Sequence, residues 1–261
     1  MIVNDFYDAK SGADLLKVAH THENNIATKP LVTGDLPLDV ARDFLKILYG
    51  SVLILSAFVP SVGSRLLVIV ATIITYCYTS YLKPIVWVKN ISCAFLMAVS
   101  PLTSAVANAN LHSIPYSSLW PDLWMLIISL FFGFLGREIL MDINDFDADK
   151  HSGIETVPGK YGRSVASGIV FGSWILSGIF VSIGPVSNLA RYILEQKTRV
   201  PFFKFIQQAS FRQSLLAVSG AIMLGRRAFQ VRNHEGIRHD INDTAIEECK
   251  KAVLLYLAAF I

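Results

Sequence analysis

The sequence has few cysteines and few charged residues. Only three cysteines occur in 261 residues, Cys77, Cys93 and Cys249, and no two of them have the CxxC spacing of a zinc or redox site. Neither a disulfide framework nor a cysteine-based metal site is therefore supported. Charged residues make up 16% of the chain against 53% hydrophobic residues, which is the wrong balance for a soluble domain of this size.

Basic residues are also too sparse to indicate a nucleic-acid partner. The net charge is only +3, and basic residues are not interleaved with aromatic ones. Residues 1–12, MIVNDFYDAKSG, are polar and lack the apolar core of a secretory signal peptide. We therefore expect neither nucleic-acid binding nor a secretion signal.

Long apolar runs are what the chain does contain. Runs close to membrane-spanning length lie at residues 44–59, 66–82, 91–107, 119–140 and 165–183, with weaker candidates at 211–224 and 252–261. The sequence therefore predicts an all-α, polytopic transmembrane helical bundle, formed by a single domain over residues 1–261.

The segments between these runs predict how the chain crosses the membrane. Residues 108–122 and 184–201 are rich in Pro, Ser and Asn and are expected to be loops, and the charged segment 226–251 is expected to be an interfacial helix. If the spans alternate, about fifteen Lys and Arg residues lie on one side and about five on the other. The positive-inside rule then predicts that the basic side is cytosolic, or the matrix or stromal side of an organelle. The choice between an organelle and a cell membrane stays open.

Four carboxylates lie at the end of the run at 119–140 and just after it, at spacings of four, three and four residues: Glu138, Asp142, Asp145 and Asp149. If the helix continues through them, they share one face. Like charges at these spacings repel by roughly 0.2–0.5 kcal/mol per pair, so a cation should balance them. Arg137 and Lys150 could do so as ordinary helix partners. The alternative is a divalent cation, with Mg²⁺ the leading candidate, completed by a phosphorylated substrate.

A second acidic motif, NDFYD, occupies residues 4–8 and places Asp5 and Asp8 one helical turn apart. An Asp pair alone is common at a helix start. The two motifs, however, are about 140 residues apart on the same predicted side, which suggests a duplicated half-site. Two metal-bearing carboxylate clusters would neutralise a departing diphosphate, which carries about three negative charges.

Two further stretches complete a pattern that extends along the chain: KPLVTG at 29–34, and a tyrosine–lysine segment at 78–83 followed by Lys89 and Asn90. Together the stretches resemble the signatures of the UbiA superfamily of intramembrane prenyltransferases. NDFYD is similar to the first motif of that family, NDxxDxxxD, although Gly12 replaces its third acid. DINDFDAD at 142–149 matches the second motif, DxxDxxxD, at all three acids, and Met141 stands where many members have Lys.

The resemblance implies a fold of nine transmembrane helices around a central cavity. Because only three residues precede the first motif, which closes the second helix of the family, the chain is expected to lack the first two helices and to be N-terminally incomplete. The implied reaction transfers a polyprenyl group from its diphosphate to a lipophilic, typically aromatic, acceptor at the membrane. The implied cofactor is Mg²⁺.

The resemblance also implies roles for individual residues. Asp5 and Asp8 would hold one Mg²⁺, and Asp142 and Asp145 the other, with support from Asp149. Asn4 would orient the first cluster. The residues implied to face the substrate are Tyr78, near the allylic carbon, and Lys83, Lys89, Arg137 and Lys150, around the diphosphate.

Three alternatives follow from the same residues. A soluble class I prenyl-diphosphate synthase also pairs two Asp-rich motifs, but its helices would be amphipathic, whereas these runs are apolar all round. A transporter or other non-catalytic membrane protein of the same fold would place its acids within the spans rather than at their ends. A catalytically inactive fragment is the third. The acceptor also stays open among a quinone ring, homogentisate, chlorophyllide and geranylgeranylglyceryl phosphate, and the segment beginning GREIL at 136–140 resembles the branch that alkylates the last.

Overall fold

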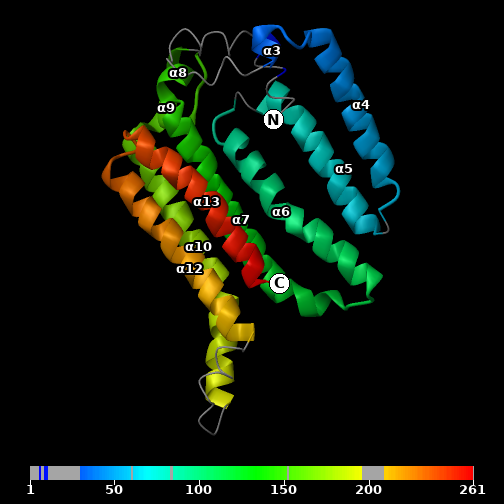
Figure 1. Cartoon of the computed structure of the whole chain (residues 1–261), viewed down its shortest axis with the longest axis vertical. Helices are drawn as coiled ribbons and strands as arrows, with labels where there is room; N and C mark the ends of the chain where they lie inside the picture. Colours follow the sequence, from blue (N-terminus) through cyan, green and yellow to red (C-terminus); the bar gives the residue numbers. More distant parts are fainter. Residues whose placement is uncertain are drawn as a thin grey trace.

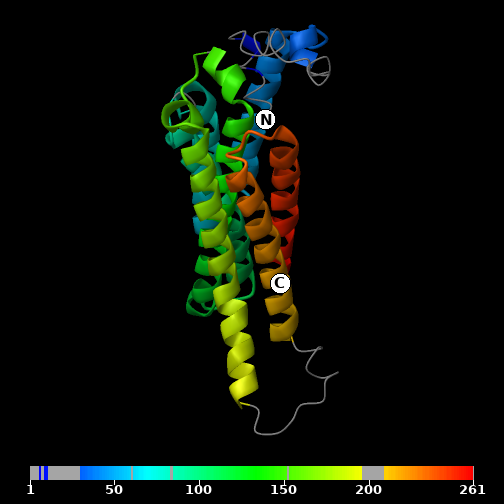
Figure 2. The ribbon, with the colours of Figure 1, turned by 90° about the vertical axis from the view of Figure 1, so that its left-hand side faces the viewer.

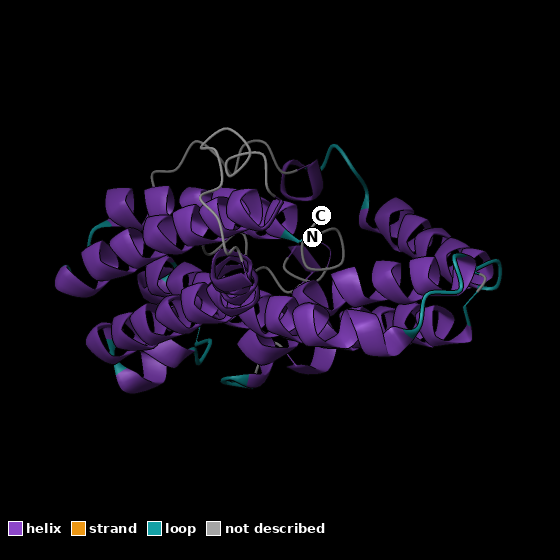
Figure 3. Ribbon diagram, turned by 90° about the horizontal axis from the view of Figure 1, so that it is seen from below, coloured by secondary structure: helices purple, strands orange, loops and turns teal. Residues whose placement is uncertain are grey.

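The computed structural model describes residues 6, 9–10, 30–59, 61–82, 85–151, 153–195 and 209–260. The long helices in these ranges are α4 (Leu38–Ser56), α5 (Val62–Cys77), α6 (Val88–Leu111), α7 (Tyr116–Asn144), α10 (Arg163–Glu195), α12 (Ala209–Asn233) and α13 (His239–Ala259). The short elements are α3 (Pro30–Thr33), α8 (Phe146–His151), α9 (Val157–Tyr161) and the π-helix η2 (Tyr78–Leu82). Within the described residues every regular element is helical (Figures 1 and 3). The all-α prediction is confirmed.

The long helices form two regions of unequal packing density. Helices α7, α10, α12 and α13 make a compact bundle in which α10 packs against both α7 and α12, and α13 packs against α12 and α7. Helix α6 packs on α7, and the α4–α5 hairpin lies on the other side of α6 (Figure 1). The last turns of α10 extend beyond the bundle (Figure 2).

Small residues and hydrogen bonds between helices hold the bundle together. The indole of Trp174 on α10 is fully buried, and its Nε1 donates to the Gly133 carbonyl of α7 at 3.0 Å. A Cβ on Gly136 would lie 2.5 Å from this indole, so only glycine permits the approach. One turn earlier, Ser129 and Ser177 each donate a hydroxyl to the carbonyl of the other at 2.8 Å. Such contacts are typical of helix packing in membranes, where burial from water supplies no driving force.

Three helical stretches are long and apolar enough to cross a membrane: Val88–Leu111, Leu123–Asn144 and Arg163–Glu195. The shorter apolar helix Val62–Cys77 accompanies them. Helix α4 also exposes large apolar side chains, among them Ile47, Ile54 and Leu55. A soluble protein rarely exposes so many together, so the fold supports the prediction of an integral, multi-pass membrane protein.

Loops were predicted at 108–122 and 184–201, but most of the described residues in these segments are helical. Helix α6 continues to Leu111, α7 already begins at Tyr116, and α10 continues through Pro185 to Glu195. Pro185 is buried within α10, and the Ser214 hydroxyl of α12 donates to its carbonyl at 2.8 Å, which ties this part of α10 to α12. Backbone N–H and C=O groups within a bilayer must form hydrogen bonds inside the protein. This requirement favours a helix even where Pro and Ser would predict a loop.

The predicted interfacial helix at 226–251 is also wrong. Residues 226–233 complete α12, and residues 239–251 form the first half of α13, which runs back along it. One of the charged residues that suggested an interfacial face, Arg227, is paired across the two helices. The Arg227 guanidinium donates to both carboxylate oxygens of Glu248, at 2.8 and 2.5 Å. Alternating charge along a sequence therefore indicated a helix–helix contact here.

Candidate active site

One end of the bundle gathers most of the predicted site residues. The start of α6, the end of α7, the short helices α8 and α9 and the turn between α12 and α13 all lie there (Figure 1). We call this the motif end.

The acidic segment is interrupted in the middle. Helix α7 ends at Asn144, Asp145 caps it with φ −85° and ψ 4°, and α8 begins at Phe146. The predicted continuous helix is thus broken at one residue, and the four carboxylates do not share an environment. The side chains of Glu138, Asp142 and Asp149 are buried, whereas Asp145 is exposed. The break occurs where Asp145, a good turn residue, meets the polar end of an apolar helix.

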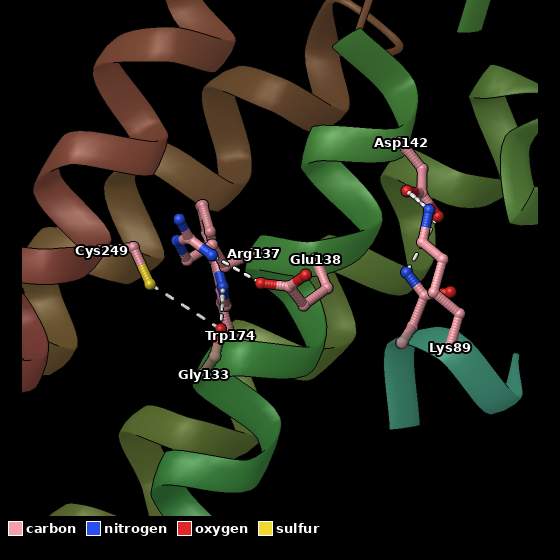
Figure 4. A network of polar contacts seen from close by, with 8 residues as sticks. Lys89, Gly133, Arg137, Glu138, Asp142, Trp174 and Cys249 are labelled. Carbon is pink, nitrogen blue, oxygen red and sulfur yellow. Dashed lines mark hydrogen bonds and ion pairs between the residues drawn. The ribbon is translucent and has the colours of Figure 1, made fainter. Parts of the chain in front are cut away.

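Asp142 is held through both of its carboxylate oxygens. The Lys89 ammonium forms an ion pair with Oδ1, and the Asn90 amide donates to Oδ2 at 2.9 Å (Figure 4). Asp142 is 4% exposed and Asn90 2% exposed. A buried carboxylate is stable only when it is paired and hydrogen-bonded, and the first turn of α6 supplies both partners. Asn90 was part of the stretch that resembles the family but was given no role, so its hydrogen bond to Asp142 was not predicted.

The first turn of α6 is itself fixed in place. Trp87, which precedes it, has φ +73°, a conformation that a bulky residue rarely adopts. Its indole Nε1 donates to the Tyr161 hydroxyl of α9 at 3.4 Å. Strained backbone of this kind persists where surrounding contacts over-determine it, which is typical of functional sites.

Arg137 and Glu138 form a second polar group about one turn along α7 from Asp142 (Figure 4). An Arg137 Nη1–Glu138 Oε1 ion pair of 2.5 Å joins them, and Glu138 is 9% exposed. Cys93 of α6 lies beside Glu138, and Cys249 of α13 donates to the Gly133 carbonyl. Arg137 is therefore paired with its own neighbour on α7, and its predicted contact with a diphosphate stays a prediction.

Segment α8–α9 covers the motif end. The Arg163 guanidinium binds Asp147 at 2.7 Å and stacks 4.4 Å from the centre of the Phe146 ring. The Thr156 hydroxyl caps α9 by accepting from the Gly159 amide. Lys150 is exposed on α8, so a charged side chain is available at this end.

A cavity of about 880 Å³ lies between α4, α5 and α6. Its walls are mainly aliphatic and aromatic, with a few hydroxyls such as Thr72 and Ser100. Tyr78, the first residue of η2, lines it together with Tyr49 of α4. Tyr78 follows the C-terminal end of α5, and the cavity lining includes none of Lys89, Asn90 and Asp142.

Four predicted residues, Asn4, Asp5, Asp8 and Lys83, fall outside the described residues. Within the described part of the chain, no group of three or more His, Cys, Asp or Glu side chains forms a metal site. The donor chemistry nevertheless fits Mg²⁺, which usually takes one or two carboxylates and completes its shell with water and substrate phosphate. Asp142 and Asp145 supply two such groups at the end of one helix.

Comparison with known proteins identifies the family. The model of the UbiA prenyltransferase family matches residues 1–194. The digeranylgeranylglyceryl phosphate synthase of Thermococcus sibiricus is 27% identical over 187 residues, which cover 71% of this chain and 59% of that protein. The synthase of the same name from Pyrococcus horikoshii is 30% identical over 190 residues, which cover 70% and 59%. The chain thus spans about three fifths of the length of these curated relatives.

Solved structures agree on the fold. A UbiA homolog from Aeropyrum pernix K1 superimposes with a TM-score of 0.64 at 15% identity, over 98% of this chain and 84% of that one. A UbiA homolog from Archaeoglobus fulgidus, bound to GPP and Mg²⁺, gives 0.58 at 17% identity, over 99% and 81%. Since the family model matches the greater part of the sequence and the helices follow the same fold, the chain belongs to the UbiA prenyltransferase family.

Proposed function

We propose that this protein is an intramembrane prenyltransferase and that residues 1–261 act as a single domain. It would transfer a prenyl group from its diphosphate to a lipid acceptor with Mg²⁺. The observation that carries the proposal is Asp142, a buried carboxylate at the motif end that Lys89 and Asn90 hold in place. It belongs to the segment that matches the second Asp-rich motif of the family.

The residues at the motif end suit the chemistry of a departing diphosphate. The allylic carbon–oxygen bond of the donor breaks, the diphosphate leaves with the electron pair, and the carbon gains positive charge. Asp142 and Asp145, with Asp5 and Asp8 of the first motif, would hold Mg²⁺, which neutralises the charge that develops on the diphosphate. Lys89, already seated on Asp142, would add positive charge beside the same group, together with Lys83, Lys150 and Arg137.

The cavity between α4, α5 and α6 suits the prenyl chain. Each methylene that moves from water into such a chamber gains about 0.8 kcal/mol. The phenol ring of Tyr78, at the cavity wall, would present its electron-rich face to the developing cation. The apolar lining, together with surrounding lipid, would also keep water from capturing the cation before the acceptor does.

The acceptor we favour is a prenylated glyceryl phosphate, because the curated relatives are named digeranylgeranylglyceryl phosphate synthase. The acceptor hydroxyl oxygen would bond to the allylic carbon and lose its proton, giving an ether. The sequence alone pointed to an aromatic acceptor, which stays a prediction to be tested beside it. The orientation of the motif end toward the cytosol, matrix or stroma also stays a prediction.

The test uses the full chain in lipid nanodiscs with Mg²⁺ and labelled geranylgeranyl diphosphate. Geranylgeranylglyceryl phosphate and homogentisate are offered in separate reactions, and release of diphosphate is followed with product formation. We expect label to enter the glyceryl phosphate lipid and Asp142→Asn to reduce the rate by about 10²–10³-fold, since a preorganised charge contact in the site is lost. Asp240→Asn is the matched control, because Asp240 is exposed and pairs only with Arg238 in the described structure.

Each outcome discriminates between the functions considered. Label in homogentisate would move the acceptor to the aromatic class. No diphosphate release, or release that Asp142→Asn leaves unchanged, would reject the enzyme and favour a non-catalytic membrane protein of the same fold.

A further inference from the structure

The turn between α12 and α13 contacts the last turn of α7, beside the acidic segment. Two consecutive residues of α13 form hydrogen bonds with the side-chain amide of Asn144, one with its oxygen and one with its nitrogen. Asn242 Nδ2 donates to Asn144 Oδ1 at 2.8 Å, and Asn144 Nδ2 donates to Asp243 Oδ1 at 2.8 Å. An amide held at both its donor and its acceptor has a fixed orientation.

Asn242 is fully buried and uses both of its amide hydrogens. The second goes to the Gly236 carbonyl in the turn, also at 2.8 Å. Its Oδ1 has no hydrogen-bond partner among the described residues. A buried polar side chain with an unsatisfied oxygen lowers stability, so packing alone does not account for an asparagine here. A role in positioning other groups does account for it.

The backbone of the turn also lies directly on α7. Gly236 has φ +68°, and a Cβ on it would be 2.6 Å from Cγ2 of Ile143, which is itself fully buried. Ile143 and Asn144 therefore face the turn, while the preceding residue, Asp142, faces Lys89 and Asn90 of α6. The last turn of α7 is wedged between two elements that are far apart in the sequence.

We propose that the α12–α13 turn, through Asn242 and its contact with Asn144, positions the end of α7 so that Asp142 and Asp145 can bind the metal and the diphosphate. The family model matches residues 1–194, so this positioning element lies beyond the matched part. The inference rests on the proposed prenyl transfer. Asn242 is a positioning residue, because it acts through Asn144 and touches neither carboxylate in the contacts that define the turn.

The test measures metal affinity as well as turnover, in the full chain. Mg²⁺ binding is titrated by calorimetry in the presence of an S-thiolo prenyl diphosphate, whose carbon–sulfur bond resists ionisation. Asn242→Ala and Asn144→Ala are compared with Asn233→Ala, an exposed asparagine at the end of α12. We expect the first two to weaken Mg²⁺ binding by about 10–100-fold, as loss of an outer partner of a metal ligand usually does.

Two further readouts separate positioning from folding. At saturating Mg²⁺ the turnover of both variants should return to within about threefold of wild type, since the ligands themselves are intact. The double variant should lose less Mg²⁺ affinity than the two single losses combined, because both changes break the shared Asn242–Asn144 contact. If Asn242→Ala does not fold, Asn144→Ala breaks the same contact from the α7 side.

The outcomes distinguish this inference from the proposed function. Wild-type protein that binds and turns over, together with variants whose Mg²⁺ affinity equals that of Asn233→Ala, would overturn the inference alone. Variants that lose thermal stability but keep their Mg²⁺ affinity would also overturn it. Wild-type protein that binds neither metal nor diphosphate would overturn both.

Discussion

The two sides of the molecule are packed for different purposes. The apolar window of α7, within the compact bundle, is 61% buried, whereas that of α6, which faces the α4–α5 hairpin, is 17% buried. Small residues and hydrogen bonds between helices close the first region, and a cavity of about 880 Å³ opens in the second. The helix that bears the carboxylates, α7, is therefore the closely packed one. The open space lies on the other side of α6, where it suits a prenyl chain.

The two regions meet at the motif end, at Asp142. Its α7 backbone belongs to the compact bundle, and its carboxylate binds Lys89 and Asn90 on α6. If the account is right, substitutions in the bundle change stability or metal affinity, and substitutions in the cavity change which donor is used. Four predictions test that division, from the largest expected effect to the smallest.

Lys89→Ala should have the largest effect on stability. It leaves the buried Asp142 carboxylate without its cationic partner, which typically costs about 3–5 kcal/mol. Thermal unfolding in detergent with EDTA should show a clear loss, and Mg²⁺ with the thiolo diphosphate should restore much of it by replacing the missing charge. Lys250→Ala is the control, because the pair of Lys250 with Glu247 is exposed. Equal melting temperatures for the two variants would contradict a stabilising role for the pair.

Gly136→Ala should destabilise the compact bundle by about 1–3 kcal/mol, since the added methyl group would overlap the Trp174 indole. Gly172→Ala is the matched control, because a Cβ there meets nothing within 4 Å. Unfolding by heat or SDS measures the difference. The donor preference of the protein that remains folded should be unchanged. A shift in preference would show that the two regions are not separate.

Ala71→Phe should act in the opposite way. It fills part of the cavity wall, so long prenyl donors should lose about tenfold or more in kcat/KM relative to geranyl diphosphate. Its melting temperature should stay close to that of wild type. Ala190→Phe, on the exposed part of α10, should leave the preference unchanged. If both donors lose activity equally, the cavity does not hold the chain.

Arg238→Ala should have the smallest effect. Through hydrogen bonds to its carboxylate, the Arg238 guanidinium lowers the pKa of Asp240, but both groups are exposed. A lowered pKa in the folded state means that the pair contributes above the ordinary Asp pKa and stops contributing as the pH falls through the lowered value. Exposed pairs contribute little, so we expect overlapping unfolding curves at pH 7 and at pH 3. A variant that is clearly less stable at pH 7 would show that this end of the hairpin depends on surface charge.

Much of the fold could be predicted from the sequence, because membrane-spanning helices are recognisable as long apolar runs. The spans at 91–107, 119–140 and 165–183 fall within α6, α7 and α10. The loop predicted at 184–201 was wrong over its described part. Pro and Ser disfavour a helix in water, but α10 continues through Pro185, which is buried in the bundle. The charged segment 226–251 was misread because one sequence does not show that Arg227 and Glu248 face each other across a helix pair.

The site was predictable in its chemistry and less so in its contacts. The acids at 142, 145 and 149 were found from their spacing, but the break at Asp145 and the seat of Asp142 on α6 depend on tertiary packing. Asn90 belonged to a stretch that resembles the family but had no predicted role, and Asn242 carries no pattern of its own, because the role of an asparagine becomes clear only once its partners are known. Asn4, Asp5, Asp8 and Lys83 lie outside the described residues, so their predicted roles stay predictions.

The central claim is that Asp142 is a metal ligand in a site that grips one diphosphate together with the first motif. The most direct measurement is electron paramagnetic resonance of Mn²⁺ bound to the full chain with the thiolo diphosphate. The account predicts two Mn²⁺ ions, close enough for their spins to couple, and the loss of one ion in Asp142→Asn and of the other in Asp5→Asn. A Mn²⁺ count and spectrum that Asp142→Asn leaves unchanged would contradict it.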